Sequence, residues 1–389
     1  MIRNYRREIN MKRLLSIFKK AGDNSLPLIL GIVLALVWAN MDYDGYTAFW
    51  HNKIFGVVDL HFLVNDIFMV FFFALAGVEI VRALSPNGSL YPMKNAVSNL
   101  FATAGGVIVP AAVFFLLIYF FGHPKYSHGW AIPTATDIAI SLLFARIVFG
   151  EKHPVVVFLI MLAVLDDAIG LAIIAVFYPD PSSPVRLVFF CFVLAAMLLA
   201  FIFNRMKIKP YLPYILIPGI ISWFGMYKAN LHPSLALIFI LPFIPNKKVL
   251  PSDKTSLDKF EHNWKYFVSF GLVFFGLANA GVELTKVSDL AIIVFLSLLF
   301  GKTIGILGFA KLAGLLRFPV PAGIKTSELF IMSLIASVGL TVSLFISSIA
   351  YVDSELQDAA KMGALFSLLN GFTAVIAAKV LLRKKPAKE

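Results

Sequence analysis

Two adjacent aspartates, Asp166 and Asp167, lie in the middle of an apolar run that reads KHPVVVFLIMLAVLDDAIGLAIIAVFY. An ionisable side chain inside a membrane-spanning segment is costly, and such residues commonly mark the path of an ion or a proton. Neighbouring residues on a helix point about 100° apart, so the two carboxylates cannot share one partner symmetrically. This spacing favours a division of labour, in which one carboxylate faces a cavity and the other faces a neighbouring helix.

Two more ionisable residues lie deep in apolar stretches. Asp137 stands in PTATDIAISLLF, and Lys302 stands in FLSLLFGKTIGILGF. Lys302 is the cation available to the carboxylate that faces a neighbouring helix, and we predict that these two groups pair. A purely structural ion pair does not explain the set, because one lysine cannot neutralise three carboxylates. Whether Lys302 only stabilises the site or also carries a proton stays open at the level of sequence.

The composition predicts an integral membrane protein. Of the 389 residues 59% are hydrophobic and 14% are charged, and the mean hydropathy is +0.85. So much apolar sequence could not form the polar surface of a soluble domain. A span needs about 20 helical residues, and we expect an all-α polytopic fold with about twelve spans. The candidate ranges are 26–40, 63–82, 96–122, 134–149, 154–177, 185–203, 211–225, 229–245, 262–283, 290–313, 327–350 and 359–382.

The distribution of Lys and Arg predicts how these spans are oriented. With the N-terminus inside, 26 of the 34 basic residues fall in the tails and the even-numbered loops, whereas 6 fall on the opposite side. Basic residues favour the cytoplasmic side. We therefore expect cytoplasmic tails at 1–25 and 383–389 around a single transmembrane domain, 26–382. The basic N-terminus lacks the cleavage pattern of a signal peptide.

Particular residues argue against other classes of protein. The net charge of +12 does not indicate nucleic-acid binding, because the basic residues lie in short loops and at the chain ends. Cys191 is the only cysteine, so no disulfide framework is expected. The GKT at 301–303 is similar to the end of a phosphate-binding loop, but Leu296 stands where the first glycine should be. No HExxH motif is present, and we expect neither an enzyme nor a cofactor.

Two of the candidate spans carry polar interruptions. Pro133, Thr134, Thr136 and Asp137 interrupt the fourth span, and the eleventh is interrupted at Ser337, Gly339, Thr341 and Ser343. Proline removes a backbone donor, and threonine can bond to the backbone in its place, so we predict broken helices. Two such segments in the two halves of a chain indicate inverted repeats whose discontinuous helices cross near the membrane midplane. Asp137 would then face N-terminal helix ends and Lys302 would face C-terminal ends.

At this point the chain resembles the NhaA-type bacterial sodium/proton antiporters. The resemblance rests on GWAIPTATDIAISL, MLAVLDDAIG, FGKTIG, FFALAGVEIVR, FGLANAGVEL and GLTVSLFIS, which occur in the family's order along nearly the whole chain. The pair of TD and LDD motifs is the most specific feature. Broken helices within inverted repeats are a property of this family, so the resemblance and the repeat argument are not independent. The resemblance implies a multi-pass protein of the bacterial inner membrane.

The resemblance also implies roles for single residues. Asp167 matches the carboxylate taken as the main Na⁺ ligand, which also carries a transported proton. Asp166 matches its neighbour, which helps to form the Na⁺ site and pairs with a lysine, here Lys302. Asp137 and Thr136 match the residues that compensate charge where the broken helices cross.

Residues nearer to the membrane surfaces match positions that the family ties to ion entry and pH response. Asp66 and Glu79 match acidic positions of the ion funnel, and His232, Glu261 and His262 match positions of pH regulation. An ordinary interfacial position is the alternative interpretation of Asp66, Glu79 and His232.

Two residues depart from the family pattern. Ala83 stands where the family often has an acidic residue after the arginine of the second span. Pro233 follows His232 and is also unusual. Both departures put the pH response in question more than the transport chemistry.

Together the residues predict a secondary active antiporter. We expect electrogenic, pH-regulated export of Na⁺ and Li⁺ in exchange for external H⁺, with alternating access at the site of Asp166 and Asp167. Another cation-coupled transporter or an ion channel is the alternative, and two broken helices favour a transporter. The expected surroundings are membrane lipid and, as the family suggests for the loop 40–62, a second copy of the chain.

Overall fold

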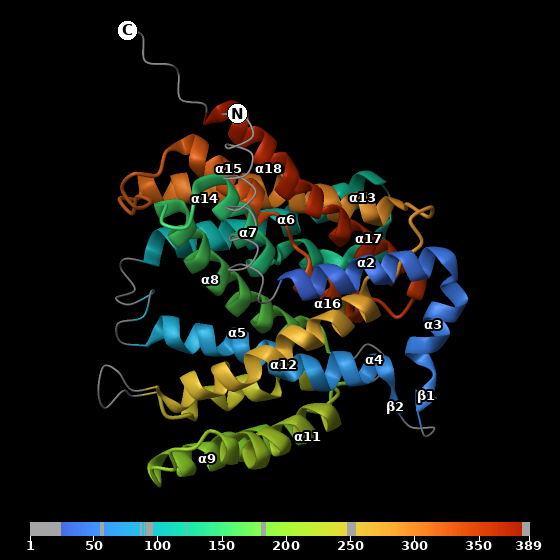
Figure 1. Cartoon of the computed structure of the whole chain (residues 1–389), viewed down its shortest axis with the longest axis vertical. Helices are drawn as coiled ribbons and strands as arrows, with labels where there is room; N and C mark the ends of the chain where they lie inside the picture. The colour runs from blue at the N-terminus through green and yellow to red at the C-terminus, as the bar shows by residue number, and fades with distance from the viewer. Residues whose placement is uncertain are drawn as a thin grey trace, which may run out of the picture.

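Helices make up most of the structure, for which we use a computed structural model of the chain (Figure 1). The described residues are 25–54, 58–85, 88, 90, 96–121, 123–179, 184–246 and 254–382. The predicted tail 383–389, and the predicted tail 1–25 apart from Ser25, lie outside them. Across these ranges the strands form one antiparallel hairpin, β1 (Lys53–Ile54) with β2 (Val58–Asp59).

Six helices are long and apolar enough to cross a membrane, counted over the described ranges. Each lies within a few residues of a predicted span. They are Leu60–Leu84, made of α4 (Leu60–Phe62), η1 (Leu63–Phe68) and α5 (Met69–Leu84); α6 (Val97–Phe121); α8 (Pro154–Phe177); Leu187–Arg205, made of η4 (Leu187–Phe189) and α9 (Phe190–Arg205); Asp289–Leu315, made of α13 (Asp289–Leu296), η8 (Ser297–Lys302) and α14 (Thr303–Leu315); and Ser354–Leu381, made of α17 (Ser354–Phe366) and α18 (Leu368–Leu381).

Two further segments are pairs of helices that bend sharply at a short break. The first pair, η3 (Pro124–Thr134) and α7 (Ile138–Phe149), bends by 54°, and the second, α15 (Thr326–Ala336) and α16 (Thr341–Ala350), bends by 46°. The breaks fall at the polar interruptions of the sequence. Counting each pair as one span raises the number of spans to eight.

The remaining helical segments are shorter or more polar than a plain span. They are α2 (Ser25–Met41), α3 (Tyr43–His51), the segment of α10 (Leu212–Tyr214), η5 (Ile215–Gly219) and α11 (Ile220–Lys228), the segment of η6 (Pro233–Phe239) and η7 (Leu241–Phe243), and α12 (Ser256–Asn279). All but α3 overlap predicted spans. The total of twelve spans therefore stays a prediction, since length and composition alone support six to eight.

The helix α8 lies in the interior of the packed helices, where it contacts α5, α6 and α7. In Figure 1 the pair α9 and α11 forms one edge of the molecule, with α12 and α5 beside it. The helix α12 packs on α2 as well as on α5. The helix α8 also contacts α15, so helices from both halves of the chain pack against it.

The position of Lys302 depends on a close contact between α6 and α14. A Cβ atom placed on Gly105 would lie 2.2 Å from the carbonyl oxygen of Gly305, and one on Gly305 would lie 2.1 Å from that of Gly105. Two glycines are needed here because any side chain would hold the backbones apart. Just before Gly305, the π-helical turn η8 ends at Lys302. Such turns insert an extra residue into a helix and are frequent at functional sites.

We predict that Gly305→Val destabilises the protein by separating α6 from α14. Overpacking of this kind costs about 1–3 kcal/mol, so the detergent-purified variant should unfold at a lower temperature than the wild type. Gly308→Val is the matched control, because a Cβ at Gly308 meets nothing within 4 Å. Equal melting temperatures for the two variants would contradict this account of the contact.

Candidate ion-binding site

The two bent helix pairs are joined at their breaks by hydrogen bonds. Thr136 Oγ1 donates to the carbonyl oxygen of Ala336 at 2.9 Å, and the backbone N–H of Asp137 donates to the carbonyl oxygen of Val338 at 2.8 Å. Ser343 Oγ donates to Ile132 O at 2.7 Å from the other direction. A broken helix leaves backbone groups without partners. These hydrogen bonds give some of the backbone groups near each break a partner from the other helix pair.

Asp137 lies at the start of two helices at once. Its carboxylate accepts a hydrogen bond from Ile140 N at 3.0 Å, in the first turn of α7. The same carboxylate accepts from the backbone N–H of Thr341 at 3.1 Å and from its hydroxyl, at the start of α16. Asp137 is 4% exposed. A negative charge at a helix N-terminus is stabilised by the helix dipole, and here one carboxylate serves two such ends.

Lys302 lies at the opposite kind of helix end. Its ammonium donates to the carbonyl oxygen of Thr134, the last residue of η3, and to Asp166 Oδ2 at 2.9 Å. The lysine is fully buried, and Asp166 is 2% exposed. A buried cation is tolerated when it is paired and hydrogen-bonded. Lys302 thereby links the helix end before the first break to α8.

The second break is held by a helix that our sequence reasoning did not single out. Ser367 Oγ accepts from Gly339 N at 3.1 Å, and Asn370 Nδ2 donates to Ser337 O at 3.3 Å. Ser367 is the residue between α17 and α18. The available signal was the pair of polar residues in the otherwise apolar FSLLNGF of the last span.

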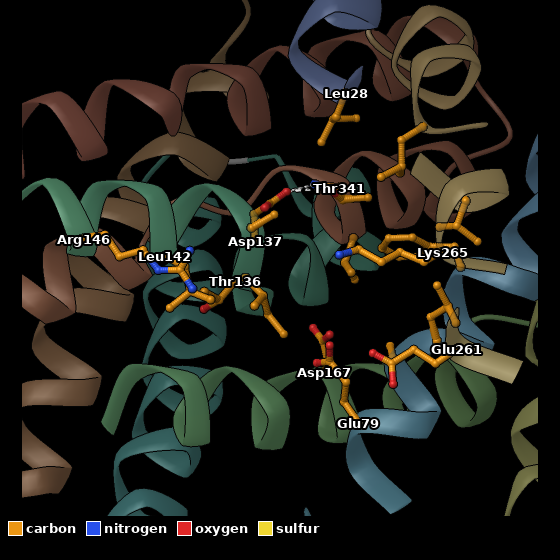
Figure 2. A pocket seen from close by; sticks show the side chains of 18 residues that line it. Leu28, Glu79, Thr136, Asp137, Leu142, Arg146, Asp167, Glu261, Lys265 and Thr341 are labelled. Carbon is orange, nitrogen blue, oxygen red and sulfur yellow. Dashed lines mark hydrogen bonds between the residues drawn. The ribbon is translucent and has the colours of Figure 1, made fainter. Parts of the chain in front are cut away.

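The neighbouring carboxylates of α8 occupy different surroundings. Asp166 is buried against Lys302, and its Oδ1 has no hydrogen-bond partner among the described residues. Asp167 is partly exposed and lines a cavity of about 300 Å³. The cavity reaches from Asp167 towards the end of α7 and the start of α12, where Arg146 and Glu261 line it (Figure 2). By the distribution of basic residues, this is the side that we predict to be cytoplasmic.

Charged side chains from four helices meet on the wall of this cavity. They are Glu79 of α5, Asp137 and Arg146 of α7, Asp167 of α8, and Glu261 and Lys265 of α12. In Figure 2 the carboxylates of Glu79 and Asp167 lie close together, and the side chain of Lys265 extends from α12 into the same space. Arg146 and Lys265 were not among the predicted site residues, because the sequence did not reveal which face of α7 or α12 borders the cavity.

An ion-pair cluster includes Glu261, which lines the cavity. Arg82, in the last turn of α5, lies 2.9 Å from Asp258 and 2.5 Å from Glu261 of α12. All three side chains are partly exposed, so each pair contributes about 0–1 kcal/mol to stability. Next to Arg82, Ala83 is buried against α8, beside Val164 and Leu165.

The remaining predicted residues lie away from this cavity. Asp66 and His232 both line two other cavities, of about 550 and 280 Å³, near the start of α5 and the end of α11. Pro233 is buried at the start of η6. His262 is exposed on α12 and does not line the cavity of Asp167.

Apolar side chains separate Asp167 from the cavities of Asp66. A narrow space next to Asp167 is lined by apolar side chains, which include Phe73, Leu171 and Val342. Phe73 and Phe345 are buried and make an edge-to-face contact with ring centroids 5.1 Å apart. Phe345 in turn lies 5.9 Å from the His232 ring, at the wall of the smaller of the two other cavities. Asp167 is thus connected to the cavity on one side and shielded on the other.

Comparison with known proteins identifies the family. The family profile described as Na+/H+ antiporter 1 matches residues 16–381. A Desulfitobacterium hafniense protein named Na(+)/H(+) antiporter NhaA is 50% identical over 369 residues, which are 93% of this chain and 95% of that protein. A Geotalea uraniireducens protein of the same name is 48% identical over 370 residues, 93% of this chain and 96% of its own. The chain belongs to the NhaA-type sodium/proton antiporter family.

The similarity extends to the fold of a more distant antiporter. The structure of the sodium proton antiporter MjNhaP1 from Methanocaldococcus jannaschii matches with a TM-score of 0.56 at 13% sequence identity, over 97% of this chain and 99% of the other. At this identity the match concerns the fold alone. NhaA-type proteins are transporters, not enzymes, and with its several long apolar helices this member is a multi-pass membrane protein.

We predict that Lys302→Met destabilises the protein, because it leaves the Asp166 carboxylate buried without its cation. Removing one partner of a buried ion pair costs about 3–5 kcal/mol, which should appear as a lower melting temperature in detergent. Adding Asp166→Asn should restore part of the loss, since the unpaired charge is then gone. Lys311→Met, on the exposed face of α14, is the control. A double variant no more stable than Lys302→Met alone would argue against the pairing.

Proposed function

We propose that this protein is a secondary active antiporter that exports Na⁺, and Li⁺, in exchange for external H⁺. The observation that carries the proposal is the position of Asp167, at the inner end of a cavity and next to the buried pair of Asp166 and Lys302. The named activity of its relatives supports the same conclusion.

Competition between Na⁺ and H⁺ for one site is enough to produce antiport. Carboxylate oxygens are suitable ligands for hard cations, and Asp167 makes no hydrogen bond or ion pair within the described part of the chain. Its oxygens can therefore take either a cation or a proton from the cavity. Asp166 contributes its Oδ1, which also lacks a partner. A site that binds one or the other, and opens to one side at a time, exchanges the two ions without a separate coupling device.

Exchange is electrogenic if two protons return for each Na⁺. Asp167 carries one proton, and the pair of Asp166 and Lys302 carries the second, on either partner. The membrane potential then contributes to Na⁺ export, because net positive charge enters the cell in each cycle.

Alternating access in this proposal depends on the two broken helices and the apolar barrier. The helix pairs cross near the midplane of a twelve-span protein of the bacterial inner membrane, with both termini cytoplasmic. Asp137 and Thr136 stabilise the crossing at its N-terminal ends, and Lys302 stabilises the C-terminal end of η3. The contact of Phe73 with Phe345 closes the outer side while the cavity of Asp167 is open to the cytoplasm. Movement of the helix pairs would close the cytoplasmic side and open the outer side.

The residues nearer to the surfaces would serve ion entry and pH response. Glu79, Glu261 and His262 lie at or near the cavity of Asp167, which we place on the cytoplasmic side. Asp66 and His232 line the two other cavities, which we place on the outer side and call the outer cavities. The hairpin of β1 and β2 would pair with that of a second copy in a homodimer.

We predict that Asp167→Asn abolishes Na⁺-driven proton movement while the protein still inserts into the membrane. The amide keeps the size of the side chain but cannot exchange a proton or offer a charged ligand. The measurement is the recovery of a fluorescent pH-gradient signal in everted vesicles on addition of Na⁺. Asp289→Asn, at the partly exposed start of α13 and away from the cavity, is the control and should retain exchange. Wild-type exchange by Asp167→Asn would refute the assignment.

A labelling experiment tests the direction in which the cavity opens. In a Cys191→Ser background we predict that Ala76→Cys, which lines the cavity beside Asp167, reacts with a small impermeant thiol reagent in everted vesicles. Ser348→Cys, on the wall of an outer cavity, should react only in intact cells with a permeable outer membrane. The reverse pattern would overturn the proposed orientation.

A further inference from the structure

Lys265 places a positive charge in the cavity that leads to Asp167. It lies on α12 one turn after Glu261, and it lines the same cavity as Glu79 and Asp167. Figure 2 shows its side chain directed from α12 into the space between Thr341 and Asp167. A cation in the wall of a cation pathway is unexpected, since it lowers the local concentration of Na⁺.

The other acidic groups of the cavity already have partners. Both oxygens of Asp137 accept hydrogen bonds from the starts of α7 and α16. Glu261 is paired with Arg82. Glu79 and Asp167, in contrast, make no hydrogen bond or ion pair within the described part of the chain. An entering Na⁺ and the Lys265 ammonium can therefore both interact with these two carboxylates.

We propose that Lys265 is a tethered competitor that sets the affinity of the site for Na⁺ from this side of the membrane. The inference rests on the proposed function. A lysine ammonium is a compact monovalent cation on a flexible stem, with three donors for carboxylate oxygens. Because it is attached to the cavity wall, its effective concentration at the site is in the range of millimolar or above. An entering Na⁺ must therefore bind against the repulsion of the ammonium, which can reach the same carboxylates.

The remaining charged group of the cavity does not have the same role. Arg146 lies near the end of α7, at the opposite end of the lining from Asp167 (Figure 2). Its charge acts on an ion that enters the cavity, whereas the Lys265 side chain extends towards the inner end. The competition depends on charge and not on ionic size, so it should weaken Na⁺ and Li⁺ binding by the same factor.

The test compares variants that separate charge from packing. Lys265→Met keeps the aliphatic stem and removes the charge, and Lys265→Arg keeps the charge. Lys259→Met is the matched control, because Lys259 is an exposed lysine of the same helix that does not line the cavity. The apparent KM for Na⁺ and for Li⁺ is measured in everted vesicles at fixed pH and fixed ionic strength. Binding of radioactive Na⁺ to the purified proteins is measured in parallel.

We expect Lys265→Met to lower the apparent KM and the Kd for Na⁺ by about fivefold, which corresponds to ~1 kcal/mol of removed repulsion. Li⁺ should follow by the same factor, and Lys265→Arg and Lys259→Met should stay close to the wild type. An unchanged or weaker affinity in Lys265→Met would overturn the inference, as would an equal shift in Lys259→Met. A wild type that binds Na⁺ without exchanging it contradicts the proposed function alone, and the binding data still test Lys265. A wild type that does neither contradicts both.

Discussion

The structure depends on how the broken helices satisfy their ends in the interior of the protein. Each break leaves backbone N–H and C=O groups where water is scarce, and such groups are costly without partners. Asp137 accepts hydrogen bonds from the N-terminal ends of α7 and α16, and Lys302 donates one to the C-terminal end of η3. Opposite charges at opposite helix ends are what the helix dipole favours. The chain can therefore interrupt two helices at its centre, provided that both charges stay in place.

The same arrangement leaves one carboxylate of α8, Asp167, for the proposed transport. Lys302 takes Asp166 as its second partner, so the neighbouring Asp167 points elsewhere, towards the cavity. The close contact of Gly105 with Gly305 holds the lysine helix against α6. One carboxylate is thus paired with the lysine at the first break, while its neighbour lines the cavity. The proposed exchange uses this asymmetry.

The sequence was informative where a residue conflicts with its surroundings. Proline, threonine and aspartate in one apolar run predicted the bend near residue 135, and serine, glycine and threonine in another predicted the bend near residue 338. The helix boundaries lie close to the predicted ranges. Periodicity could not identify which face of α12 borders the cavity, so Lys265 was missed. Ser367 was missed because a single hydroxyl in an apolar helix can also bond to its own backbone. The number of spans stays unsettled by length and composition, since several helical segments are too short or too polar.

The central claim is that Na⁺ and H⁺ compete for the same carboxylate. Its most direct test is to add Na⁺ to the purified protein in weakly buffered detergent solution and to record the pH. The account predicts that Na⁺ and Li⁺ release protons from the protein, whereas an equal concentration of choline does not. A saturable Na⁺ binding signal without proton release would contradict it, because the two ions would then occupy separate sites.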